Sequence, residues 1–225
     1  NQRTAIALVG IALLVMAVGQ GGGTIAVGVV EEKTSRIVEL LLATIRPAHL
    51  LWGKILGIGI VNLLQVGVVA IAALITASVT GILTVPGVAL SAAAVSLVYF
   101  VLGYLFFAGL YAALGATVSR QEEVNSTTWP LLILLLGSFY AGFFGVQSPE
   151  STLLRVLAWI PPFSTTVIPM RVATGDASGA ELAGSTVVMV LTVLIVGWLA
   201  SRIYGRSVLS YGSKVSIKNA LGVGA

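Results

Sequence analysis

The sequence predicts an all-α integral membrane protein with about five transmembrane helices. Hydrophobic residues make up 57% of the 225 residues and charged residues only 9%, whereas a soluble domain carries about 25% charged residues. Uncharged stretches run from residue 4 to 30 and from 55 to 119, and about 20 apolar residues suffice to span a bilayer. These stretches are apolar on every face, which excludes the alternating pattern of a transmembrane β-barrel.

Turn-forming residues divide the long stretches into spans. The first span covers about 4–30. The stretch from 55 to 119 is too long for one helix and is broken at Thr80-Gly81 and Pro86-Gly87, which gives spans at about 54–79 and 89–118. Further spans are predicted at about 127–146 and 182–203. The sequence thus predicts a single transmembrane domain over 1–225, with a charged segment at 31–46, a proline-containing segment at 147–181 and a tail at 204–225.

The distribution of basic residues predicts the orientation of the spans. Nine Lys and Arg residues fall on one side of the spans and three, namely Arg3, Arg155 and Arg171, on the other. The positive-inside rule therefore places the charged segment and the C-terminal tail in the cytoplasm and residue 1 outside. A chain that starts outside at Asn1 indicates a fragment, and we expect at least one further helix to precede it.

The charged segment at 31–46 has the pattern of a helix that lies along the membrane face. Apolar residues recur there at helical spacing, at Ile37, Leu40, Leu41 and Ile45. We expect Pro47 to end this helix. An interfacial anchor and a docking helix for a cytoplasmic protein both fit the pattern. Acidic and basic residues balance each other in the segment, which suits protein recognition better than binding to anionic lipid.

The charged segment also carries a resemblance to a known family. The run from Val30 to Glu39, with the later Arg46-Pro47 and Gly53-Lys54 pairs, resembles the permease subunits of ABC-2 type exporters, especially the NatB-like branch. Shorter runs similar to family segments are Ile160-Pro161-Pro162-Phe163-Ser164, Tyr204-Gly205-Arg206 and Tyr211-Gly212. The resemblance implies a six-helix transmembrane domain, of which this chain holds five helices, with the first helix and an extracellular insertion missing before residue 1.

The resemblance further implies a role in efflux across a bacterial plasma membrane. Segment 31–46 would be a coupling helix that contacts a separate ATPase subunit, and a second permease copy would complete a homodimer. ATP and Mg²⁺ would bind to the ATPase. The implied coupling residues are Glu31, Glu32, Lys33, Thr34, Ser35, Arg36, Glu39 and Arg46.

The chain itself offers little material for catalysis. It has no cysteine and a single histidine, His49, and it contains no G-x-x-x-x-G-K-[ST] phosphate-binding loop. We therefore expect no enzyme activity, no cofactor and no metal site in this chain. The basic residues lie beside spans, where topology explains them, so we expect the lipid bilayer and no nucleic acid among its partners.

Few polar residues interrupt the spans. Four of them are candidates for a substrate path, although hydrogen bonding between helices is the alternative interpretation: Gln20, Asn62, Gln65 and Tyr99. No Asp, Glu, Lys or Arg lies inside a predicted span, which argues against an ion-coupled carrier. The second functional hypothesis is a scaffold or regulatory subunit that docks a cytoplasmic protein without transporting anything.

Three smaller features complete the predictions. Segment 147–181 is expected to be an interfacial helix with Trp159 at headgroup level, with a short re-entrant element as the alternative. Small residues at four-residue spacing predict close helix packing; they are Gly19 with Gly23, Gly53 with Gly57, and Ala108 with Ala112 and Ala116. The turn at 120–123 is expected to cap a helix rather than to contact a partner.

Overall fold

The computed structural model describes residues 2–34, 44–79 and 86–207, and its regular structure in these ranges is α-helical. The long helices are α1 (Gln2–Thr34), α3 (Pro47–Val79), α4 (Pro86–Thr117), α5 (Glu122–Gly145) and α8 (Gly179–Ser207). Two short helices, α6 (Thr152–Leu157) and α7 (Pro161–Thr174), lie between α5 and α8. Within the described ranges five helices are long and apolar enough to cross a membrane, which confirms the predicted number of spans.

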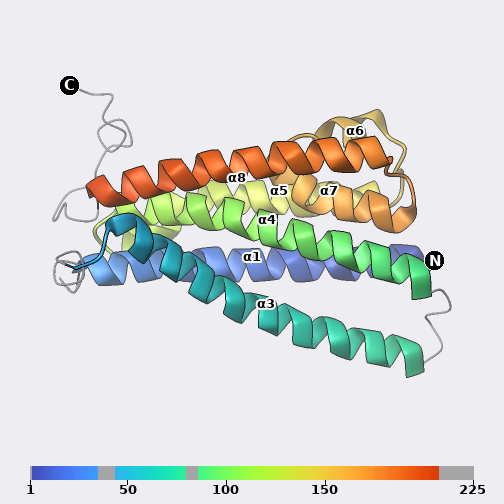
Figure 1. The fold of residues 1–225 in the computed structure, drawn as a ribbon, viewed down its shortest axis with the longest axis horizontal. Helices are drawn as coiled ribbons and strands as arrows, with labels where there is room; N and C mark the ends of the chain where they lie inside the picture. The colour runs from blue at the N-terminus through green and yellow to red at the C-terminus, as the bar shows by residue number, and fades with distance from the viewer. Residues whose placement is uncertain (1, 35–43, 80–85, 208–225) are drawn as a thin grey trace.

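The long helices form one bundle with two distinct ends (Figure 1). The charged end holds the end of α1, the start of α3, the end of α4, the start of α5 and the end of α8. The far end holds the start of α1, the end of α3, the start of α4 and the two short helices. The predicted alternation of the spans is therefore present in the fold.

α1 and α4 pack closely at the centre of the bundle. The stripe of alanines in α4 is buried, as its small-residue spacing predicts, at Ala108, Ala112 and Ala116. A Cβ atom on Gly115 would lie 2.9 Å from both the Cα and the carbonyl oxygen of Ala26. Such small residues let two helix backbones approach each other in a membrane protein. The result is a contact between α1 and α4 that involves the backbone itself.

α3 is the most exposed of the long helices. Near the charged end its Trp52 ring packs against Gly197 of α8, and the Tyr104 hydroxyl donates a hydrogen bond to the Ile55 carbonyl at 2.8 Å. Beyond Asn62 its large apolar side chains are exposed, at Leu64, Val68, Val69, Ile71, Ile75 and Val79. α3 diverges from α1 toward the far end (Figure 1). Among the described residues, the contacts that hold α3 are therefore concentrated in its first half.

The boundaries around the charged segment differ from the prediction. Residues 31–34 continue α1 instead of starting a separate helix. Pro47 begins α3, so the expectation that it ends a helix was wrong. A proline suits the first helical position because its missing N–H group would have no partner there. Residues 35–43, with Ser35, Arg36 and Glu39, lie outside the described residues.

α7, in the second half of the segment 147–181, is inserted into the bundle. Its residues 164–171 are buried, and it contacts α1, α4, α5 and α8. Glycines on two neighbours make the room: a Cβ on Gly103 would lie 2.2 Å from Thr165 Cγ2, and one on Gly142 would lie 3.1 Å from Thr166 Cβ. Trp159 remains partly exposed at the edge of the bundle. α7 thus has the protein cover that a re-entrant element requires, and the interfacial and re-entrant interpretations of segment 147–181 both stay predictions.

The first residues of α7 show how its backbone N–H groups are satisfied where the helix enters the bundle. The first N–H groups of a helix lack intrahelical partners, and an unpaired N–H group in a bilayer costs several kcal/mol. Pro161 and Pro162 carry no N–H group, and those of Phe163 and Ser164 donate to the Ile160 carbonyl at 2.9 and 2.8 Å. The Ser138 hydroxyl of α5 also donates to the Pro162 carbonyl at 2.7 Å. The half-buried start of α7 thus leaves few backbone donors unpaired, and Ser138 of α5 adds one bond to it.

Candidate coupling site at the charged end

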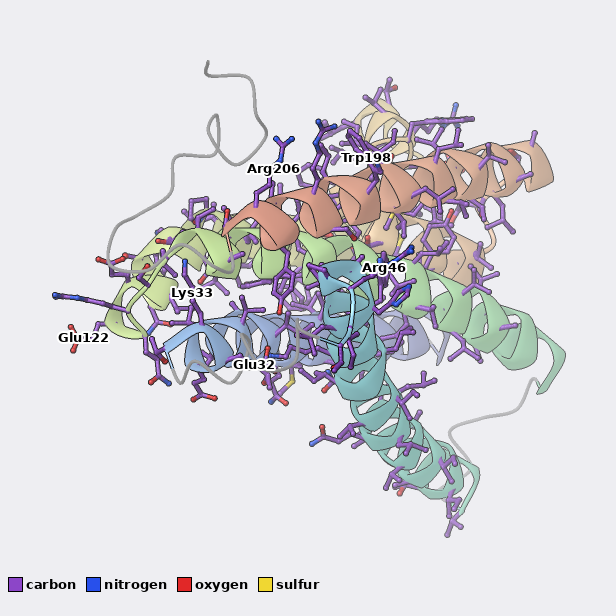
Figure 2. All side chains as sticks on the ribbon, turned by 60° about the vertical axis from the view of Figure 1, so that its left-hand side comes forward. Glu32, Lys33, Arg46, Glu122, Trp198 and Arg206 are labelled. Carbon is purple, nitrogen blue, oxygen red and sulfur yellow. The ribbon has the colours of Figure 1, made fainter. Side chains whose placement is uncertain are left out.

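The last turn of α1 contacts three other helices through three successive residues. We call Glu31, Glu32 and Lys33 the α1 hub (Figure 2). Successive residues on an α-helix point about 100° apart, because there are about 3.6 residues per turn. Glu31 contacts the residue that precedes α5, Glu32 contacts α3, and Lys33 contacts the end of α4. The hub therefore joins α1 to α3, to the end of α4 and to the residue before α5.

Lys33 holds α1 to the end of α4. Its side chain is buried, and its Nζ donates hydrogen bonds to the carbonyl oxygens of Ala116 at 3.1 Å and Val118 at 3.2 Å. Carbonyls at the end of a helix lack intrahelical partners and carry a partial negative charge, so a lysine is favourable there. Lys33 was predicted as a contact for a partner subunit, and the structure instead places it inside the bundle.

The two glutamates form more exposed links. Glu32 Oε2 lies 2.7 Å from Lys54 Nζ of α3, and this ion pair is partly exposed. Glu31 Oε1 accepts a hydrogen bond from Gln121 Nε2 at 3.2 Å on the surface. Gln121 makes no side-chain cap for α5, so the predicted cap is instead a link between α5 and α1. Glu122 and Glu123 occupy the first turn of α5, where the helix dipole favours negative charge.

A shallow groove of about 500 Å³ lies beside the Glu32–Lys54 pair. We call it the α3 groove; its lining includes Glu32, Ile45, His49, Leu50, Lys54 and Ile58. Gly53 and Gly57 also line it, and no described atom lies within 4 Å of where their Cβ atoms would be. The predicted helix contacts of these two glycines are therefore not made within the described part of the chain. His49 is exposed, as predicted.

The four candidate residues of a substrate path do not meet in one place. Asn62 is buried beside Gly21 of α1, and its Nδ2 has no hydrogen-bond partner among the described residues. Tyr99 is buried in a different cluster, where its hydroxyl lies 3.1 Å from Thr186 Oγ1. Gln20 and Gln65 are exposed. Of the four, only Asn62 presents an unpaired polar group inside the bundle. The described ranges contain no group of three His, Asp or Glu side chains suited to a metal ion.

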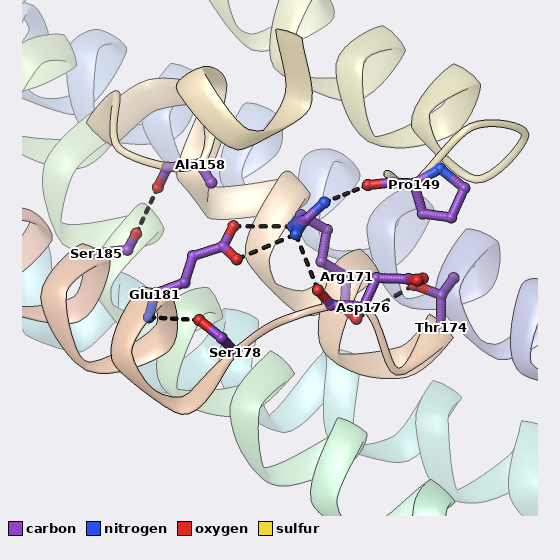
Figure 3. Close-up of polar contacts among 8 residues, drawn as sticks. All are labelled: Pro149, Ala158, Arg171, Thr174, Asp176, Ser178, Glu181 and Ser185. Carbon is purple, nitrogen blue, oxygen red and sulfur yellow. Dashed lines mark hydrogen bonds and ion pairs between the residues drawn. The ribbon is translucent and has the colours of Figure 1, made fainter. Parts of the chain in front are cut away.

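A second polar cluster, which sequence reasoning missed, lies at the far end (Figure 3). The Arg171 guanidinium forms a bidentate ion pair with Glu181 of α8, at 2.9 and 3.1 Å. It also donates to the carbonyls of Asp176, at 2.9 Å, and Pro149. We call this set the Arg171 clasp. Gly175, with φ of 89°, ends α7 and turns the chain back toward α8. An arginine ten residues before Glu181, in a segment with few other charges, was the available signal.

The fold defines a multi-pass α-helical membrane protein with a short helix inserted among its long helices. A sequence model described as ABC-2 family transporter protein matches residues 1–202. The chain therefore belongs to the ABC-2 transporter family, whose members serve as transmembrane, non-catalytic components in membrane transport. This confirms the family predicted from the charged segment, whereas the NatB-like branch stays a prediction.

Two relatives of this chain come from a bacterium and an archaeon. The chain is 31% identical over 204 residues to the uncharacterized protein YhaP of Bacillus subtilis (strain 168), which is 86% of this chain and 49% of that protein. It is 30% identical over 212 residues to the uncharacterized protein MJ1024 of Methanocaldococcus jannaschii, which is 93% of this chain and 51% of that protein. The chain thus spans about half the length of the curated relatives it matches. No solved structure matches it.

Proposed function

We propose that this chain is the permease part of an ATP-driven exporter, and that a separate ATPase subunit drives it through the segment that begins at the α1 hub. The observation that carries the proposal is the hub itself. Three successive residues link α1 to α3, α4 and α5, and the segment predicted to contact the ATPase follows directly in the chain. A force on that segment would therefore reach four helices at once.

The charges of the described side chains support a cytoplasmic charged end. Six basic residues lie there, namely Lys33, Arg46, Lys54, Arg120, Arg202 and Arg206. Two, Arg155 and Arg171, lie at the far end. The positive-inside rule favours the charged end as the cytoplasmic one. The ATPase, with its ATP and Mg²⁺, would then bind at the charged end, and substrate would leave at the far end.

The packing suggests which helices move together. α1 and α4 share a backbone contact at Gly115 and the buried Lys33 bonds, so they would move as one body. α3 is tied to α1 by a partly exposed ion pair, and its far half is not packed on the described chain. We expect ATP binding to shift α3 relative to α1 and α4 in a rigid-body switch. Asn62, which lies at the contact of α1 with α3, would then meet substrate in one state only, as a transport cycle requires.

The partner prediction is tested by purification of the full-length protein in mild detergent and mass spectrometry of what accompanies it. We expect a stoichiometric subunit with a phosphate-binding loop and two copies of the permease. A homo-oligomer that retains no ATPase after mild crosslinking would contradict the proposal and favour the scaffold hypothesis.

The coupling prediction is tested by a distance measurement that needs no knowledge of the substrate. These 225 residues contain no cysteine, so cysteines can be introduced singly for spin labelling. Labels at Val79→Cys of α3 and Val187→Cys of α8, both exposed positions, measure the distance between these two helices at the far end. We expect the distance between the labels to change when the assembled complex is trapped with ATP. Lys33→Met should abolish the change while ATP hydrolysis continues. Arg202→Met, at an exposed arginine that lies over Trp198, serves as the control.

The same measurement distinguishes transport from scaffolding. If ATP leaves the distance unchanged in the parent protein, although the ATPase is bound and active, the chain docks a partner without being moved by it. If Lys33→Met and Arg202→Met respond alike, the α1 hub does not transmit the motion.

A further inference from the structure

The α3 groove has a polar end and an apolar end. Glu32 and His49 line it where the bundle carries its charges, and Gly57 and Ile58 line it further along α3. Pro47 and Ile58 are 11 residues apart, which is roughly 16 Å along a helix at 1.5 Å per residue. The candidate membrane span of α3 begins at Pro47. The groove therefore extends from the membrane surface into the apolar layer.

The charged side chains that line the α3 groove balance each other, and one exposed basic residue, Arg46, stands beside its polar end without lining it. Lys54 Nζ faces Glu32 across 2.7 Å, and this pair is neutral as a whole. Arg46 is exposed just before α3, and its carbonyl accepts hydrogen bonds from the N–H groups of His49 and Leu50 (Figure 2). The start of α3 adds the positive end of a helix dipole. The charge of this end is therefore complementary to a singly charged anion such as a phosphodiester.

The apolar end of the groove has space for a hydrocarbon chain. Gly53 and Gly57 present bare backbone, with no described atom within 4 Å of where a side chain would begin. Leu50 and Ile58 flank them with apolar side chains. A water-soluble anion would use the polar end only, and a soluble protein would not reach residues within the membrane span. An amphipathic molecule already in the bilayer fits both ends.

We propose that the α3 groove binds an anionic phospholipid from the leaflet at the charged end, with its phosphate near Arg46 and Lys54 and an acyl chain along Gly53 and Gly57. The bound lipid would fill the contact region of α3 with the α1 hub, where Glu32 and the phosphate compete for Lys54. This inference does not depend on the proposed coupling to an ATPase, because it rests on the shape and charge of the groove alone.

The experiment measures which lipid occupies the groove in the assembled full-length complex. A bimane label at Gly57→Cys measures quenching by lipid in the groove. The same label at Gly67→Cys, where the Cβ position on α3 also has no described atom within 4 Å, measures quenching by lipid outside the groove. The complexes are placed in phosphatidylcholine vesicles that contain brominated phosphatidylglycerol or brominated phosphatidylcholine as quencher. We expect about fivefold preferential quenching by phosphatidylglycerol at residue 57, since each basic residue near an anionic headgroup contributes about that factor. We expect no preference at residue 67.

Charge variants assign the preference to the groove. Arg46→Gln with Lys54→Gln should remove the preference at residue 57, and Lys54→Arg should keep it. Glu32→Gln should raise it, because Lys54 then loses its competing carboxylate. Equal preference at residues 57 and 67, or a preference that survives the double variant, would overturn the proposal. A preference that appears only after partner subunits are stripped away would assign the groove to a protein contact and overturn it as well.

Discussion

The two ends of the bundle connect their helices in different ways. At the far end one buried guanidinium, that of Arg171, joins the segment after α5, the end of α7 and the start of α8. At the charged end three residues of α1 each make one link, and two of these links are partly exposed. Removing the Arg171 guanidinium would break all links of the Arg171 clasp together, whereas each link at the charged end can break by itself. We therefore expect the segments joined by Arg171 to stay together as the rigid part, and α3, with its single ion pair to the α1 hub and its exposed far half, to be the helix that moves.

The largest effect expected from this comparison is that of Arg171→Met. Arg171 is 2% exposed and its partner Glu181 12%, so the variant leaves a largely buried carboxylate without its charge partner. Breaking such a pair costs about 3–5 kcal/mol. We expect the free energy of unfolding of the full-length protein in detergent to fall by this amount. Arg155→Met, at an exposed arginine of α6, should change it by less than about 0.5 kcal/mol. Similar losses in the two variants would show that the Arg171 clasp does not hold the far end together.

An intermediate effect is expected from glycine substitutions that compare the packing at the two ends. A Cβ on Gly115 would lie 2.9 Å from backbone atoms of Ala26, which cannot move aside easily, so Gly115→Ala should cost about 1–3 kcal/mol. Gly145, at the far end, is the matched control. A Cβ there would meet the ends of the Met170 and Leu154 side chains, which can rotate away. We expect Gly145→Ala to cost less than half as much in the same unfolding measurement. The reverse order would place the tighter packing at the far end.

The smallest effect on stability is expected from Glu32→Gln. The ion pair with Lys54 is partly exposed, and such pairs contribute about 0–1 kcal/mol. We expect the free energy of unfolding to change within that range. We also expect the labels at residues 79 and 187 to show no change in distance when ATP is added. Stability and coupling would then be separate properties of the charged end. A large loss of stability would instead make Glu32 a structural residue.

Much of the fold could be predicted because long apolar runs leave few alternatives. The five spans and the break between α3 and α4 follow from hydropathy and from turn formers. The buried alanine stripe of α4 follows from its spacing. The charged segment was found because its charges interrupt otherwise apolar sequence. These features depend on local composition, which a sequence displays directly.

The remaining features depend on which helices become neighbours. α7 contains Ser164, Thr165, Thr166 and Arg171, and such polarity predicts exposure unless the partners Ser138 and Glu181 are known to be near. Lys33 was expected on the surface because nothing in its own segment shows that the end of α4 lies beside it. Pro47 was interpreted as a helix end because a proline at a boundary is compatible with either the end of one helix or the start of the next.

The insertion of α7 also has a consequence for the order in which the protein is assembled in the membrane. α7 has 14 residues, fewer than the roughly 20 that cross a bilayer, and it carries a buried arginine whose carboxylate partner belongs to α8. It cannot be stable in lipid before its neighbours are present. During synthesis, α7 is therefore expected to wait at the membrane surface until α8 has emerged and inserted, and to enter the bundle last.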